Sequence, residues 1–120
     1  MNPGDEFELH VTPDRYVTVR YAGASGDFNP IHYDHPFAVA AGFPSVIAHG
    51  MLSMAFFGRL LGAHEVRRIS TRFKAVTFPG DVVTVEGEVV CLENETAEIR
   101  LWARTPRGVT LEGSATLVLH

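Results

Sequence analysis

The sequence predicts an α+β domain in which an antiparallel sheet curls around one long apolar helix. Two observations favour this class. Residues 51–61 are apolar around nearly the whole circumference of a helix, and such a helix must be covered on most sides. The second half of the chain alternates apolar and polar residues with a period of two, which is typical of strands with one buried face. In a chain of 120 residues, one curling sheet is the economical cover for that helix.

The first helix is expected to begin at Thr12-Pro13-Asp14 and to run to about Ala24. The threonine hydroxyl would cap the helix, the proline would take the first helical position, and the acid would lie in the first turn. Residues 26–30 then form a turn, because the residue before a proline avoids helical backbone angles and because Asp and Asn side chains bond their own backbone.

Two more helices are predicted before the sheet. A short one opens at Asp34-His35-Pro36 and ends near Gly42, and the apolar one extends over residues 49–62. Strands are expected at residues 83–91, 97–104 and 111–119, with turns at 93–95 and 105–108, and two earlier strands near 7–10 and 65–74 complete the sheet.

Composition describes one ordinary globular domain spanning residues 1–120. The net charge is −4 and no basic tract is present, so broad electrostatic binding of nucleic acid is not expected. The longest apolar stretch is too short to cross a bilayer, and the acidic N-terminus does not resemble a signal peptide, so a cytoplasmic protein without membrane association is expected. The single cysteine, Cys91, has no partner for an internal disulfide and is predicted to be a small buried apolar residue.

Catalytic chemistry is indicated by an acid and an imidazole, Asp27 and His32, five residues apart on the turn. A carboxylate and an imidazole that share one water can add that water across a conjugated double bond, provided that a helix N-terminus polarises the carbonyl. Gly50 opens the apolar helix, and a glycine there lets a ligand approach the backbone N–H closely. Taken alone, the turn also permits a plain interpretation, in which Asp27 closes a turn and His32 bonds a backbone carbonyl.

A metal site is not predicted. His32, Asp34 and His35 are close in sequence, but Pro36 adjoins them and no matching set of ligands occurs elsewhere. The arginines of residues 59–72 are most simply solvated, although they could contact a coenzyme A phosphate or an acidic carrier protein.

Three segments together resemble the MaoC-like hydratases and dehydratases, the (R)-specific enoyl-thioester hydratase family. They are the block from Tyr21 to Met54, the run Ala48-His49-Gly50-Met51 within it, and the stretch from Phe73 to Asp81 with its Phe-Pro-Gly-Asp ending. The resemblance covers residues 15–119. It implies the hot-dog fold, a single-hot-dog protein that forms a dimer, and reversible hydration of 2-enoyl thioesters or dehydration of (3R)-hydroxyacyl thioesters, carried by coenzyme A or acyl carrier protein. No cofactor is implied.

The resemblance also implies roles for individual residues. Asp27 and His32 would activate the water, in an order that the sequence leaves open, and the Gly50 N–H would hold the thioester oxygen. We assign the substrate pocket to residues that flank these three, with His49 also serving a structural role and Asn29 also fixing the turn: Phe28, Asn29, His49, Met51 and Ser53.

Other functions stay open at this point. A thioesterase of the same fold is less favoured, because its usual acid on the central helix is missing between His49 and His64. A hot-dog subunit of a heterodimeric dehydratase and a tailoring enzyme that adds another nucleophile to the double bond are the remaining alternatives. Acyl chain length, the carrier, the physiological direction and the pathway are not predicted.

Overall fold

The computed structural model describes residues 1–120 and contains one antiparallel sheet with the strand order β1-β3-β4-β5-β2. The strands are β1 (Glu6–Val11), β2 (Glu65–Phe73), β3 (Val83–Glu93), β4 (Thr96–Thr105) and β5 (Gly108–Val118), and the helices are α1 (Arg15–Ser25), α2 (His35–Ala40) and α3 (Gly50–Leu61), with a 3₁₀ turn η1 at Pro30–His32. The predicted sheet around one helix is therefore confirmed, and each predicted element is found within a few residues of its expected place.

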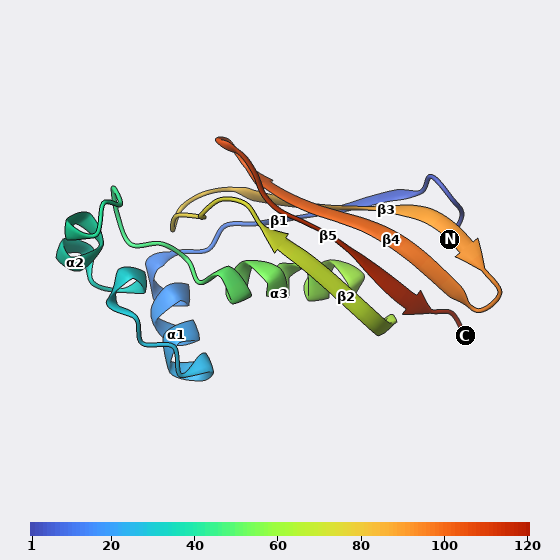
Figure 1. Cartoon of the computed structure of the whole chain (residues 1–120), viewed down its shortest axis with the longest axis horizontal. Coiled ribbons are helices and arrows are strands. Elements are labelled where there is room, and N and C mark those ends of the chain that lie inside the picture. Colours follow the sequence, from blue (N-terminus) through green and yellow to red (C-terminus); the bar gives the residue numbers. More distant parts are fainter.

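Helix α3 lies along one face of the sheet, while α1 and α2 lie beyond one end of it (Figure 1). The core forms between them: Phe57 and Leu61 of α3 are buried against strand residues such as Val85, Leu101 and Leu117. The expectation that α3 is covered on most sides is wrong for the single chain. One side of α3 faces outward, and Met51 on that side is 57% exposed, because the sheet reaches only the other side.

The start of α1 differs from the prediction. Asp14, not Thr12, is the N-cap: its backbone is extended and its side chain accepts a hydrogen bond from the Val17 N–H at 2.9 Å. A carboxylate caps at least as well as a hydroxyl, so the later residue takes the position and Pro13 stays outside the helix. The caps of α2 agree better with prediction, since Asp34 accepts from the Phe37 N–H at 3.1 Å.

The prediction that Cys91 is buried is wrong, because Cys91 is only half-buried. The pairing register of β3 with β4 shifts between Val89 and Cys91. Such a bulge breaks the period of two, so the residues that follow Val89 no longer alternate as the sequence suggested. None of the helices is long and apolar enough to cross a membrane.

Candidate active site

The turn after α1 is built by short side chains that bond the backbone ahead of them. Gly26 ends α1 with a φ of 78°, a left-handed angle that glycine adopts without strain. Asp27 Oδ1 then accepts from the Asn29 N–H at 3.2 Å, and Asn29 Oδ1 accepts from the Ile31 N–H at 3.2 Å. These bonds start η1, and η1 carries His32 into the interior.

His32 is held by the segment that precedes α3. Its Nδ1 lies 2.7 Å from the Ile47 carbonyl oxygen, and the Ile47 N–H donates to the Ile31 carbonyl at 3.0 Å. Because a carbonyl oxygen can only accept, Nδ1 carries the proton and Nε2 of the neutral ring has a free lone pair. That Nε2 lies 3.9 Å from Asp27 Oδ2. The separation is too long for a hydrogen bond between the two groups and leaves them free to hold one water in common.

His49 contacts both Asp27 and His32. Its Nε2–H donates to the Asp27 carbonyl oxygen at 3.0 Å, and its ring stacks on the His32 ring with 3.7 Å between centroids and 21° between planes. The Tyr21 and His49 rings pack in a T-shaped arrangement, with 4.8 Å between their centroids. His49 is 2% exposed, and its Nδ1 is buried without a hydrogen-bond partner. These contacts favour a structural role in fixing the relative positions of Asp27 and His32.

Asp27, His32 and His49 place one potential metal ligand atom each within 4.8 Å of the others. The geometry of the two rings does not suit an ion, however. Imidazole lone pairs lie in the ring plane, and two stacked, nearly parallel planes do not meet at the metal–nitrogen distance of about 2 Å. The expectation of no metal stays a prediction.

The N-terminus of α3 faces the same region with free donors. His49 is the N-cap residue and makes no side-chain cap bond, and the first N–H with a partner in the helix is that of Ser53, which donates to the His49 carbonyl. The N–H groups of Gly50, Met51 and Leu52 precede it and are the groups that a helix leaves unpaired. They can therefore donate to an oxygen on which negative charge develops.

Two cavities meet at Gly50 and Phe73. One, of about 420 Å³, is lined by Tyr21, Ser25, Asp27, His49 and Met51 together with those two residues. The other, of about 220 Å³, holds His32 and Ser53 among mostly apolar neighbours, and its full lining is His32, Ile47, Ala48, Gly50, Ser53, Phe73, Ala75, Val76, Thr77 and Leu111. Asp27 thus lines one cavity and His32 the other, and the two cavities share Gly50 at the α3 N-terminus.

The structure brings six of the eight predicted site residues to these cavities. Phe28 and Asn29 line neither one: Phe28 is 60% exposed and its carbonyl accepts from the Tyr33 hydroxyl, while Asn29 serves the turn. Sequence reasoning missed Tyr21, Phe73 and Thr77, which line the cavities from α1, β2 and the loop after β2. Tyr21 belongs to the first segment that the resemblance included, and Phe73 and Thr77 belong to the last; the resemblance was the only signal for them.

An ion pair fixes the loop that follows Thr77. The Arg107 guanidinium donates two bonds to the Asp81 carboxylate, one of them from Nη1 at 2.9 Å, and lies over the Phe78 ring at 4.6 Å. The Phe78 N–H also donates to Asp81, at 2.8 Å. The hydrogen bonds from Arg107 hold the pKa of the Asp81 carboxyl below its ordinary value of 3.8.

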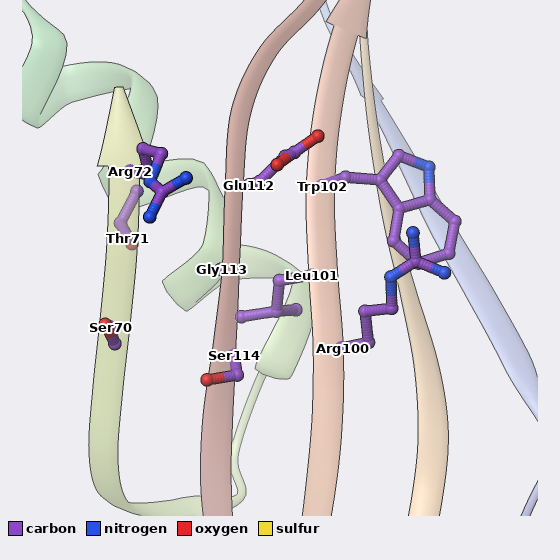
Figure 2. Close-up of a pocket in the computed structure, with 9 residues that line it drawn as sticks. All are labelled: Ser70, Thr71, Arg72, Arg100, Leu101, Trp102, Glu112, Gly113 and Ser114. Carbon is purple, nitrogen blue, oxygen red and sulfur yellow. The ribbon is translucent and has the colours of Figure 1, made fainter. Parts of the chain in front are cut away.

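A hollow larger than these two cavities lies elsewhere, on the outer face of the sheet over β2, β4 and β5 (Figure 2). Its volume is about 610 Å³ and its lining is mostly polar. Arg72 reaches in from β2, Glu112 rises from β5, and Arg100 lies over the Trp102 ring at 5.0 Å. The opposite face of the sheet carries α3, so this hollow takes no part in the site around Asp27 and His32.

Comparison with known proteins agrees with the geometry. The family model described as "MaoC like domain" matches residues 1–106. The peroxisomal hydratase-dehydrogenase-epimerase of Saccharomyces cerevisiae is 34% identical over 97 residues, which cover 76% of this chain and 10% of that protein. The (R)-specific enoyl-CoA hydratase of Aeromonas caviae is 40% identical over 81 residues, 62% of this chain and 60% of that protein. The match therefore spans less than two thirds of either relative.

A solved structure, described as the (R)-hydratase from A. caviae involved in PHA biosynthesis, superimposes with a TM-score of 0.95 at 31% identity. The superposition covers 100% of this chain and 98% of that one. The arrangement of one sheet around one helix is thus the hot-dog fold, and the chain belongs to the MaoC-like family.

Proposed function

We propose that this protein is a hydro-lyase that adds water to 2-enoyl thioesters and removes it from (3R)-hydroxyacyl thioesters. One observation carries the proposal: His32 Nε2 and Asp27 Oδ2 lie 3.9 Å apart beside the free N–H groups of the α3 N-terminus. Relatives that are named as (R)-specific hydratases support the same reaction class.

In the hydration direction, a water held between Asp27 and His32 loses a proton to His32 Nε2 as its oxygen attacks C3. The Nδ1–H bond to the Ile47 carbonyl keeps that lone pair available and stabilises the ring once it is charged. The same proton then returns to C2, so water adds to one face of the double bond. Dehydration follows these steps in reverse.

Attack at C3 moves electron density onto the thioester oxygen. We assign this oxygen to the Gly50 N–H at the positive end of α3, and the position of Gly50 in the lining of both cavities supports the assignment. A donor fixed before the reaction stabilises the transition state more than the substrate, and donors of this kind are worth about 10²–10³ in kcat in other enzymes.

The single chain leaves apolar surface around the site uncovered. Met51 and Phe73, which line the larger cavity, are 57% and 51% exposed. Apolar groups gathered at a cavity mark an interface or a ligand site. We therefore include in the proposal a homodimer whose second copy covers this region, with a second hot-dog subunit as the alternative partner. Use of coenzyme A or acyl carrier protein, and a cytoplasmic location, remain predictions.

The reaction is tested with crotonyl-CoA by following two signals in one sample. Loss of the enoyl absorbance with formation of the (3R)-hydroxy product supports a hydratase. Release of free thiol without loss of the double bond would instead identify a thioesterase and overturn the proposal. Light scattering on the same preparation measures the mass, for which one chain alone gives 13.2 kDa and a dimer twice that value.

A further inference from the structure

The hollow on the outer face of the sheet carries positive charge that the chain itself does not neutralise. Arg72 of β2 and Arg100 of β4 both line it (Figure 2). Neither takes part in any of the six ion pairs of the chain. Arg104, further along β4, does have a partner, Glu86, at 2.7 Å. The net charge of the chain is −4, so two unpaired arginines at one hollow make a local excess of positive charge on an acidic protein.

One acid lines the hollow, and it does not pair with Arg72. Glu112 is opposite Arg72 in the register of β2 with β5, where opposite charges would stabilise the strand pair. It pairs instead with Lys74, at 3.5 Å between Nζ and Oε2. Figure 2 shows the Glu112 carboxylate on the side of Trp102 and the Arg72 guanidinium on the side of β2. The guanidinium is therefore left to face the hollow without a counter-charge.

Small residues form the floor of the hollow beside Arg72. Ser70 and Ser114 are paired across β2 and β5, and Arg100 is opposite Ser114 in β4. Gly113 contributes no side chain, and none would fit, because an added Cβ would overlap the Ser70 carbonyl oxygen. Hydroxyl and guanidinium groups are donors from which phosphate oxygens commonly accept hydrogen bonds. This end of the hollow thus has the chemistry of a phosphate site.

The other end of the hollow offers a flat surface. The Arg100 guanidinium lies over the ring of Trp102, 5.0 Å from its centroid. Nucleic-acid bases stack on aromatic rings and on guanidinium planes alike. Strand β5 separates Arg72 on β2 from this surface on β4, so the two ends are about 10 Å apart, which is two strand spacings. A diphosphate joined to a base through a sugar extends over a distance of that order.

We propose that this hollow is a second ligand site, separate from the reaction site, and that it binds a nucleoside diphosphate. Arg72 would donate to the phosphate oxygens together with the two serine hydroxyls of the floor, and the base would stack at Arg100 and Trp102. The guanidinium suits this task, because its planar fork matches phosphate geometry and it stays charged at every physiological pH.

Trp102 is a built-in probe of this hollow, because the chain has no other tryptophan. Titration with ADP in a phosphate-free buffer should change its fluorescence up to a plateau, and calorimetry on the same samples gives the Kd. ADP should bind about tenfold or more tightly than pyrophosphate or adenosine, since each of these occupies one end of the hollow only. The absence of a plateau with ADP, or pyrophosphate that binds as tightly as ADP, would overturn the proposal.

Variants at the two ends should differ in a defined way. Arg72→Gln should weaken both ADP and pyrophosphate about tenfold or more, because hydrogen bonds between charged groups are lost. Arg100→Gln should weaken ADP more than pyrophosphate. Arg20→Gln is the matched control, because Arg20 is exposed on α1, forms no ion pair and does not line the hollow. An ADP Kd that is the same in Arg72→Gln and wild type would place the ligand elsewhere and refute the assignment.

Hydration kinetics test whether the site is separate. The nucleotide end of a coenzyme A thioester has the same chemistry as ADP, so saturating ADP is added to the crotonyl-CoA assay. A separate site predicts an unchanged KM for crotonyl-CoA. A rise in KM that Arg72→Gln abolishes would assign the hollow to the thioester substrate and overturn a second site. The binding measurements need no activity, so a protein that binds ADP but does not hydrate crotonyl-CoA would contradict the proposed function alone.

Discussion

His32 and His49 stack face to face, 3.7 Å apart, and this contact connects the two halves of the site. His49 bonds the Asp27 backbone while its ring supports the His32 ring. A group that holds an acid and a base in register can affect the rate without touching the substrate. His49 itself transfers no proton in the proposed reaction. Replacing it should therefore lower the rate less than replacing Asp27 or His32.

We expect His49→Phe to lower kcat about tenfold, which corresponds to a free energy close to that of one hydrogen bond, with little change in KM. The phenyl ring keeps the stack on His32 but cannot donate to the Asp27 carbonyl. Steady-state kinetics on an enoyl thioester measures this, and His49→Gln, which retains a donor and loses the ring, is the companion variant. If both variants keep wild-type kcat, His49 does not position the pair.

Gly50→Ala should impair catalysis although alanine favours a helix. An added Cβ would lie 3.2 Å from Phe73 Cε1, inside the region where the two cavities meet. We expect kcat/KM to fall about tenfold or more, because Phe73 or the start of α3 must shift by a few tenths of an ångström and small displacements at a site are costly.

The control is Gly58→Ala on the same helix, where an added Cβ meets no atom within 4 Å. It should stabilise the protein by roughly 0.5–1 kcal/mol and leave kcat/KM unchanged. The double variant Gly50→Ala with Phe73→Ala should recover part of the activity if the contact with the ring is the cause. Equal kinetics for Gly50→Ala and wild type would argue against a role for this N–H.

The Asp81–Arg107 pair makes a prediction about acid stability. Because folding lowers the pKa of Asp81 below 3.8, the folded state favours the carboxylate. Its contribution is complete at neutral pH and is lost as the pH falls below about 3.8 through the folded-state pKa. Asp81→Asn should cost about 1 kcal/mol at neutral pH, a modest figure because half of the Arg107 side chain is exposed.

Urea denaturation between neutral pH and pH 3 measures this directly. The difference between Asp81→Asn and wild type should shrink toward zero at the acid end. Glu86→Gln, which breaks the more exposed pair with Arg104 at 2.7 Å, should cost less at neutral pH. A difference for Asp81→Asn that is the same at both pH values would contradict the proposed cause.

Local signals in the sequence predicted much of this structure. Asp34 caps α2 where the run Asp34-His35-Pro36 predicted a helix start, and the apolar circumference of residues 51–61 indicated a helix packed against a sheet. The turn at 26–30 was likewise readable, because glycine and the Asx residues act on their immediate neighbours.

Features that depend on residues far apart in the chain could not be predicted from the sequence. The bulge after Val89 arises from pairing with β4, and no residue type in β3 indicates it. Tyr21 and Phe73 reach the site only because α1 and β2 meet at the α3 N-terminus.

The most direct test of the account is the hydration rate of crotonyl-CoA by Asp27→Asn and His32→Ala. The Asp27 carboxylate is half exposed, whereas His32→Ala removes a buried ring that stacks on His49, so circular dichroism with thermal melting is needed to show that each fold persists. We predict that each folded variant loses roughly 10²–10⁴ in rate, the usual range for a general acid or base. Turnover near the wild-type rate in both folded variants would contradict the shared-water mechanism.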